Sequence, residues 1–188
     1  MTSTPVLDAA TRALAAQPQH SARLLLRPLA AADRDQVARI YRDPEVMRYI
    51  DPGQDFTDDE VDRRMAAAQA RWVEAGFDMW TMLERESGEF VGRGGLILSD
   101  ELGEVEVGYM LARERWGMGF ATELTEFALG FGFRTIGLDR VVAVVDGPHT
   151  ASQHVLQKAG LTYQKETTYK GGPVRYFAID RPAWEGLA

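Results

Sequence analysis

The chain has 188 residues, 45% of them hydrophobic, and a formal net charge of -7 with no cysteine. This length and apolar content suit one domain with a substantial core. The acidic charge argues against non-specific nucleic-acid binding, which needs a basic surface, and the absence of cysteine excludes disulfides, thiolate metal sites and an acyl-cysteine intermediate.

Residues 1–20 are rich in alanine and predict a short helix or a loose arm. They carry neither the basic segment nor the long apolar segment of a secretory signal, and no apolar run approaches the roughly 20 residues of a membrane span. The three histidines lack the spacing of a zinc site. We therefore expect a cytoplasmic protein with no metal and no membrane partner, built as an N-terminal arm at 1–20 and a single domain at 21–188.

A strand and two helices are the next predicted elements. The apolar run at residues 23–29 predicts the strand, and Pro44 ends the first helix. The second helix has its apolar residues on one face and Gly76 at the position of a C-terminal cap. Capping-box pairs precede the two helices, at Asp33 with Gln36 and at Thr57 with Glu60.

Three strands follow the second helix. Residues 79–84 and 90–98 flank a turn and predict a hairpin. Residues 104–111 alternate, so two sets of side chains point to opposite faces of this strand. One set is Glu104, Glu106, Gly108 and Met110, and the other is Val105, Val107, Tyr109 and Leu111.

The rest of the chain predicts a glycine-containing loop, a helix, a buried strand at 140–145, a helix from about Thr150 to Gly160, and a closing hairpin. No repeat or second domain is evident. This order of elements predicts an α/β (α+β) fold, with a mixed, mostly antiparallel central sheet of about seven strands and helices on both faces.

The glycine loop, Arg113–Gly119, lies between the alternating strand and the next helix. It lacks the Gly-Lys-Ser/Thr of a Walker A loop and the third glycine of the dinucleotide fingerprint. The first turn of a helix leaves its N–H groups free, so a diphosphate fits along residues 116–122. Gly119 and Ala121 allow close approach. Taken alone, the loop also suits a simple turn.

Several motifs occur in one order along residues 21–181. Residues 43–50 and 104–111 match an inter-helix segment and a strand of one family, and residues 149–160 match its helix that opens Asn-x-x-Ser. By these segments the chain resembles the GNAT-superfamily N-acetyltransferases, near their ribosomal-protein-alanine (RimJ/RimL-like) branch. The acetyl-CoA motif of that family, Gln/Arg-x-x-Gly-x-Gly/Ala, aligns with Trp116, Gly117, Met118, Gly119, Phe120 and Ala121.

The resemblance implies a GNAT-like fold and an enzyme that moves the acetyl group of acetyl-CoA directly to a primary amine, on a protein N-terminus or a small molecule. It implies that backbone N–H groups at Met110 and Leu111 hold the acetyl carbonyl. The residues that it assigns to acetyl-CoA binding are Met110, Leu111, Trp116, Gly117, Met118, Gly119, Phe120, Ala121, Thr122, His149 and Ser152.

Two catalytic residues, Glu106 and Ser152, also follow from the resemblance. Glu106 would take the amine proton through water, and its alternative is a structural strand carboxylate. Ser152 would assist the leaving thiolate, and its alternative is a residue that satisfies free N–H groups at the helix start. Two departures weaken the match: Leu156 stands where many members have a tyrosine acid, and His149 stands where they have asparagine.

The sequence does not fix the acceptor. Trp72, Trp80 and Met47 are candidates for its pocket, although core packing is favoured for Trp72. The departures at His149 and Leu156 keep open a non-catalytic acyl-CoA-binding sensor or scaffold. The glycine loop alone keeps open a nucleotide-binding module without CoA. The sequence also leaves open whether the protein is a homodimer.

Overall fold

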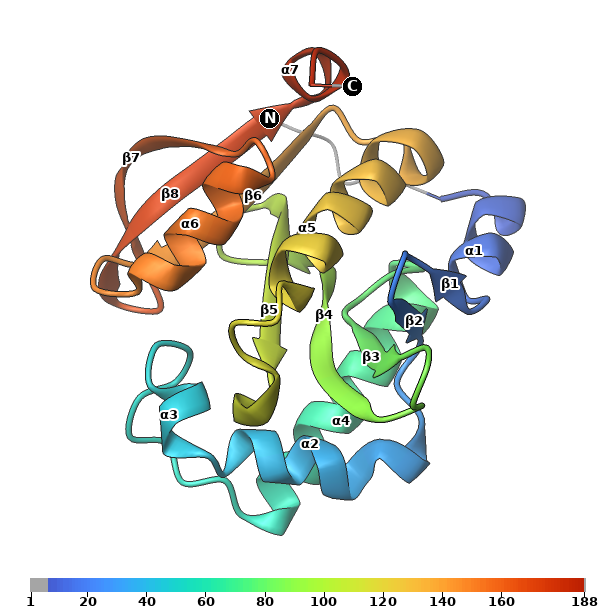
Figure 1. Ribbon diagram of the computed structural model, residues 1–188, viewed down its shortest axis with the longest axis vertical. Coiled ribbons are helices and arrows are strands. Elements are labelled where there is room, and N and C mark those ends of the chain that lie inside the picture. The colour runs from blue at the N-terminus through green and yellow to red at the C-terminus, as the bar shows by residue number, and fades with distance from the viewer. Residues whose placement is uncertain (1–6, 188) are drawn as a thin grey trace.

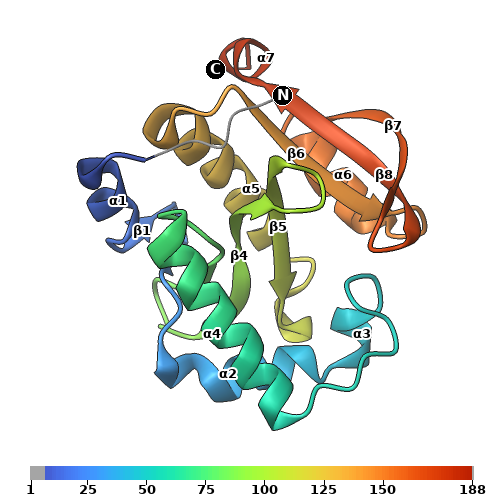
Figure 2. The same ribbon diagram turned by 180° about the vertical axis from the view of Figure 1, so that it is seen from behind.

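A computed structural model describes residues 7–187 and places them in three layers, with one sheet between two sets of helices (Figure 1). The helices α5 (Phe120–Phe131) and α6 (Thr150–Lys158) cover one face. The helices α2 (Arg34–Tyr41) and α4 (Asp58–Glu74) lie across the other face, as the view from behind shows (Figure 2). This arrangement is the predicted α/β fold with helices on both faces.

The strands are β1 (Gln19–His20), β2 (Leu24–Arg27), β3 (Trp80–Glu84), β4 (Phe90–Ser99), β5 (Glu104–Leu111), β6 (Arg140–Asp146), β7 (Thr162–Tyr169) and β8 (Gly172–Asp180). They form one sheet in the order β1-β2-β3-β4-β5-β6-β8-β7. Every neighbouring pair is antiparallel except β5 with β6. The sheet therefore has eight strands where about seven were predicted, because a two-residue strand leaves no periodicity in the sequence.

The shorter helices are α1 (Ala9–Ala15), α3 (Pro44–Met47) and α7 (Arg181–Glu185), with helical turns at Ala31–Asp33, Arg113–Arg115 and Gly132–Ile136. Helix α1 is the short helix expected near the N-terminus, and Arg12 joins it to the end of α4 by donating to the carbonyls of Val73 and Glu74. The first six residues of the predicted arm lie outside the described residues. Among residues 7–187, no helix is long and apolar enough to cross a membrane.

The predicted caps of α4 are confirmed in part. The Thr57 hydroxyl accepts the N–H of Glu60 at 3.3 Å, and Gly76 has a φ of +83° after the last turn. The Glu60 carboxylate does not complete the capping box, because it binds the Arg63 and Arg64 side chains that follow it on the same helix.

The predicted capping box at Asp33 and Gln36 is wrong. Asp33 is buried, and its carboxylate accepts from both terminal nitrogens of Arg27, from the Thr81 hydroxyl and from the N–H of Ala30. A cation and a buried hydroxyl on two strands therefore engage the oxygens that a cap would use, and α2 begins without a side-chain cap.

Trp72 and Trp80, two of the residues predicted to line an acceptor pocket, pack against the hydrophobic core. The Trp80 side chain is 1% exposed, and its ring lies 5.1 Å from the ring of Phe131 and 5.8 Å from that of Phe127. Trp72 packs on it with ring centroids 6.4 Å apart. These aromatic contacts fix α4, β3 and α5 relative to one another, which confirms the core interpretation of Trp72 and removes Trp80 from the pocket.

The sheet is open between β5 and β6. These strands pair at one position, Glu106 with Val142, whereas β4 and β5 pair along the whole of β5. Beyond Glu106 the two strands diverge toward Leu111 and Asp146, which Figure 1 shows as a widening gap below α5. Backbone groups on the facing edges of β5 and β6 beyond this position therefore lack a strand partner and are free to bind other groups.

Close packing of α5 on β4 yields the first prediction. A Cβ atom on Gly94 would lie 2.1 Å from the Leu124 side chain of α5, a distance that no packing tolerates. We therefore expect Gly94→Ala to lower the free energy of unfolding by about 1–3 kcal/mol, since α5 must move off the sheet. Urea unfolding followed by circular dichroism measures this, with Gly147→Ala as the control because a Cβ there meets nothing within 4 Å. Equal stability of the two variants would contradict the packing.

Candidate functional site

A cavity of about 530 Å³ lies where β5 ends, between the glycine loop, the first turns of α5 and α6, and the segment around α3. Its walls therefore come from four stretches of chain that are far apart in the sequence. They include ten of the predicted site residues, namely Met110, Leu111, Trp116, Gly117, Gly119, Phe120, Ala121, Thr122, His149 and Ser152.

Residues 117–122 form a cradle of free N–H groups at the start of α5. Gly117 and Gly119 have φ values of +73° and +82°, a region that favours glycine. Within residues 7–187, no protein acceptor receives a hydrogen bond from the N–H groups of 117–122, and the next N–H, that of Glu123, donates to the carbonyl of Gly119. Together with the helix dipole, which places roughly half a positive charge here, these donors favour an anion.

The sequence analysis missed the residue that braces this cradle. Arg23, just before β2, donates to the carbonyl of Met118 at 2.9 Å and to the carboxylate of Glu123 at 2.7 Å. Its guanidinium also lies over the Phe120 ring, 4.5 Å from the centroid. Hydrogen bonds from Ser21 and Arg23 outweigh burial and lower the pKa of Glu123, so this carboxylate stays charged and holds β2 to α5.

The Met118 side chain does not line the cavity. It is exposed, and the loop turns it away while its carbonyl faces Arg23. The Trp116 side chain does line the cavity, and its indole N–H donates to the carbonyl of Leu111 at 3.0 Å. That bond ties the loop to the end of β5, so the two parts of the predicted binding motif form one wall.

The N–H groups of Met110 and Leu111, both predicted to hold the acetyl carbonyl, point to opposite edges of β5. The N–H of Ala112 donates to the carbonyl of Val91, on β4, at 2.9 Å. Because N–H directions alternate along a strand, the N–H of Met110 also faces β4. The N–H of Leu111 faces the open gap beside β6, where a ligand carbonyl has access to it.

Ser152 and Tyr109 form a hydroxyl pair in this cavity. The phenol oxygen of Tyr109, on β5, lies 2.9 Å from the hydroxyl of Ser152, in the first turn of α6. Within the described residues this is the hydrogen bond of the Ser152 hydroxyl, so the capping role proposed as its alternative is not what the side chain does. Burial raises the pKa of Tyr109 to about 12, and the phenol therefore remains protonated.

Tyr109 was placed on the correct face of its strand but was not recognised as a site residue. Its partner lies 43 positions later in the chain, so no local spacing reveals the contact. Leu156, where the resemblance expects a tyrosine, is 1% exposed and packs in the core. The site therefore has a phenol, which comes from β5 and not from α6.

His149 lines the cavity at the start of α6 and stacks on Tyr49, with ring centroids 4.4 Å apart. Burial lowers the pKa of this imidazole below its usual value, so the ring is neutral near pH 7. The stacked pair joins the segment after α3 to α6 and covers the cavity from one side.

Glu106 lies apart from these residues, on the opposite face of β5. Burial raises the pKa of its carboxyl to about 7, against the opposing effects of the Val144 N–H and the charge of Lys170. The Tyr169 hydroxyl donates to Glu106 at 3.5 Å from the strand β7. Glu106 is thus a half-protonated group at neutral pH, beside the one position where β5 and β6 pair.

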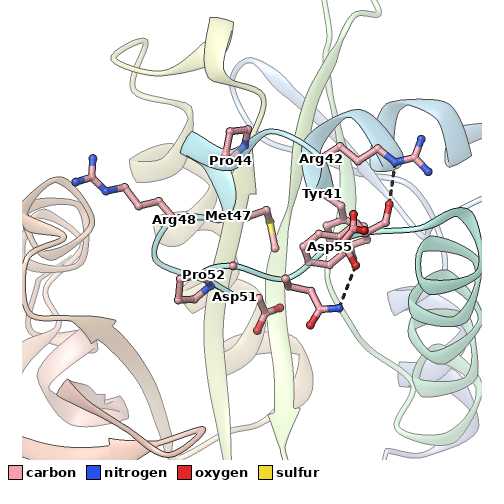
Figure 3. A pocket seen from close by; sticks show the side chains of 11 residues that line it. Tyr41, Arg42, Pro44, Met47, Arg48, Asp51, Pro52 and Asp55 are labelled. Carbon is pink, nitrogen blue, oxygen red and sulfur yellow. Dashed lines mark hydrogen bonds between the residues drawn. The ribbon is translucent and has the colours of Figure 1, made fainter.

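A second cavity, of about 510 Å³, lies on the outer side of the segment around α3 and includes Met47, the third acceptor-pocket candidate. In Figure 3 the Met47 side chain points toward Tyr41, while Arg48 extends away from the other labelled residues. Arg48 also lines the first cavity, so this segment separates the two hollows.

Comparisons with known proteins relate the chain to one family. The family model described as an acetyltransferase (GNAT) domain matches residues 23–162. An uncharacterised N-acetyltransferase of Bacillus licheniformis, p20, is 32% identical over 149 residues, which cover 78% of this chain and 82% of that protein.

Two solved structures from Vibrio cholerae are similar in fold at 18% identity. A spermidine N-acetyltransferase in complex with CoA and spermine has a TM-score of 0.73 and matches 87% of this chain and 98% of its own. A candidate ribosomal-protein-serine acetyltransferase has a TM-score of 0.72 and matches 88% of this chain and 98% of its own.

The raised pKa of Glu106 yields a prediction about stability. The unfolded carboxyl has a pKa of about 4.3, so the stability that comes with its protonated folded form is present below that pH and is lost as the pH rises through 7. Glu106→Gln cannot ionise. We therefore expect the wild type to lose about 1–3 kcal/mol more unfolding free energy than Glu106→Gln between pH 5 and pH 8. Urea unfolding at both pH values measures the difference, and parallel losses in the two proteins would mean that Glu106 is not buried as described.

Proposed function

This chain belongs to the acetyltransferase (GNAT) family and is an acetyl-CoA-dependent acyltransferase, and we propose that it moves the acetyl group directly to a primary amine on a protein N-terminus or a small molecule. The observation that carries the proposal is the row of free N–H groups at residues 117–122, which opens on the gap between β5 and β6. The cradle suits the diphosphate of acetyl-CoA, and the gap suits its extended thioester arm.

Leu111 orients the thioester in this proposal. Its N–H faces the gap, so it donates to the acetyl carbonyl and stabilises the negative charge that grows on that oxygen as the amine attacks. The amine nitrogen bonds to the carbonyl carbon, the carbon–sulfur bond breaks, and the nitrogen gives up a proton. Because the chain has no cysteine, an acyl-cysteine intermediate cannot form, and the acetyl group passes directly from sulfur to nitrogen.

Glu106 receives the amine proton, through water. A carboxyl with a pKa of about 7 is a stronger base than an ordinary glutamate and is still partly ionised at neutral pH. It lies on the face of β5 opposite the CoA cavity, so the acceptor enters from that face and meets the thioester within the gap. Attack and deprotonation then take place on the same side of the acetyl carbon.

Ser152 and Tyr109 handle the leaving sulfur on the other face. The Ser152 hydroxyl donates to the thiolate, and Tyr109, which stays protonated, donates in turn to Ser152. The free N–H groups at the start of α6 add positive potential at the same place. A proton that reaches the sulfur completes the products, an N-acetyl amide and CoA thiol.

The assignment to the ribosomal-protein-alanine branch is part of the proposal. Its support is the form of the loop, where Trp116 precedes the two glycines, and the order of the motifs along residues 21–181. The similar structures at 18% identity add the fold alone.

Isotope-labelled acetyl-CoA tests the function directly. The protein is incubated with peptides of different N-terminal residues and with small monoamines and polyamines, and mass spectrometry detects labelled N-acetyl products. Since the chain has no cysteine, a thiol reagent reports released CoA without background from the protein. We expect labelled amide and free CoA in equal amounts for at least one amine. CoA binding with no labelled amide from any amine would contradict the proposal and favour a non-catalytic sensor.

Binding at the cradle is tested with Gly119→Val. A Cβ at this position would lie 3.4 Å from the Arg23 guanidinium that braces the loop, and the left-handed φ disfavours valine. The cradle should therefore change shape, and we expect acetyl-CoA affinity to fall at least about a hundredfold, the equivalent of roughly 2.7 kcal/mol. Calorimetry measures the change. Gly137→Val is a matched control, because Gly137 has the same left-handed φ of +84° but a Cβ there meets nothing within 4 Å. Equal affinities in the two variants would place the diphosphate elsewhere.

The hydroxyl pair is tested by a double-mutant cycle. We expect Ser152→Ala and Tyr109→Phe each to lower kcat about tenfold to a hundredfold, with little change in acetyl-CoA affinity. Because Tyr109 acts through the Ser152 hydroxyl, the double variant should lose little more than either single variant. Additive losses, or normal turnover in Ser152→Ala, would contradict a shared role in thiolate stabilisation.

A further inference from the structure

The turn between β7 and β8 holds a lysine in an unusual backbone conformation. Lys170 has a φ of +50° and is the one non-glycine residue with positive φ among residues 7–187. The left-handed region is sterically unfavourable for a residue with a Cβ atom. Since Gly171 follows and glycine adopts such a φ freely, the turn alone gives no reason for a lysine at this position.

Three contacts hold Lys170 in place. Its N–H donates to a carboxylate oxygen of Glu101 at 2.8 Å, and its ammonium donates to Asp51 at 3.0 Å. The ammonium also lies 5.8 Å from the centroid of the Tyr169 ring. Asp51 lies 119 positions earlier in the chain. The lysine therefore joins the β7–β8 turn to the segment after α3, two parts that face each other in both views (Figures 1 and 2).

The same ammonium acts on Glu106. Its charge is among the influences that lower the pKa of that buried carboxyl, and the neighbouring Tyr169 donates to it. Lys170 thus lies at the side of the sheet from which an amine reaches Glu106. Among the leading influences of the described residues on the pKa of Glu106, Lys170 is the one cation.

Asp51, a carboxylate at this entrance, is already paired with two cations. Asp51 accepts from Arg64 at 2.7 Å as well as from Lys170, and its side chain is 16% exposed. In Figure 3 the segment that carries Asp51 forms the rim of the second cavity. A positively charged group on an incoming acceptor that approaches Asp51 therefore meets the charge of Lys170.

We propose that Lys170 is a specificity-determining residue: its ammonium takes the place that a second cationic group of an acceptor would occupy, so the site favours amines with no second positive charge near the reacting nitrogen. This inference rests on the proposed function, since it concerns the acceptor of that reaction. The Lys170 side chain is 51% exposed, so its contact with Asp51 is weak enough to open when an acceptor enters.

A pair of acceptors of equal length tests the inference. Butylamine and 1,4-diaminobutane differ by one terminal cation, and kcat/KM is measured for both with the wild type and with Lys170→Met. Removal of a like charge near the surface should raise the ratio of diamine to monoamine kcat/KM about fivefold to tenfold. Lys170→Asn should do the same, because asparagine tolerates a left-handed φ and the effect then belongs to the charge and not to the backbone.

The matched control is Lys165→Met. Lys165 lies on the same hairpin and is exposed, but its ammonium lies over the Tyr176 ring, 5.2 Å from the centroid, and away from Asp51. We expect it to leave the ratio unchanged. An unchanged ratio in Lys170→Met, or an equal rise in Lys165→Met, would overturn the inference.

Calorimetry separates this inference from the proposed function. Binding of 1,4-diaminobutane to the CoA-loaded protein needs no turnover, and we expect Lys170→Met to bind it about fivefold to tenfold more tightly than the wild type. If no amine is acetylated, the proposed function fails while the binding comparison still decides the role of Lys170. If butylamine is acetylated but diamine affinity is the same in both proteins, the role of Lys170 is wrong and the reaction stands.

Discussion

The single point of pairing between β5 and β6 is the constraint on which the site depends. A parallel pair needs a crossover, and here α5 supplies it, so the helix that forces the two strands to run side by side also brings its N-terminus to the place where they part. Full pairing would close the gap and bury the N–H of Leu111 in the ladder. The divergence of the strands therefore places an anion cradle next to a free N–H donor, that of Leu111.

The two faces of β5 separate the two proton transfers of the proposed reaction. Successive side chains of a strand point to opposite faces, and β5 uses this property to carry Glu106 on one face and Tyr109 on the other. Burial raises the pKa of both groups, that of the Glu106 carboxyl to about 7 and that of the Tyr109 phenol to about 12. One group is thus ready to accept a proton and the other to keep one. The sensor alternative rested on Leu156 and His149, and Tyr109 provides the hydroxyl that Leu156 lacks.

Elements that depend on local pattern were predictable from the sequence. The alternation of residues 104–111 gave the bounds of β5, Gly119 marked the start of α5, and Thr57 capped α4. Contacts between distant residues were not predictable, because nothing in a local window specifies them. Ser152 meets Tyr109 across 43 positions, and Arg23 reaches the Glu123 side chain across 100. The failed cap at Asp33 has the same cause, since Arg27 and Thr81 compete for its oxygens.

A crystal structure of the complex with CoA tests the central claim most directly, because it locates the diphosphate and the sulfur at once. The account predicts diphosphate oxygens within hydrogen-bonding distance of the N–H groups of residues 117–122. It also predicts the sulfur in the gap between β5 and β6, on the side of Ser152 and not of Glu106. A diphosphate held elsewhere, or a sulfur outside the gap, would contradict it.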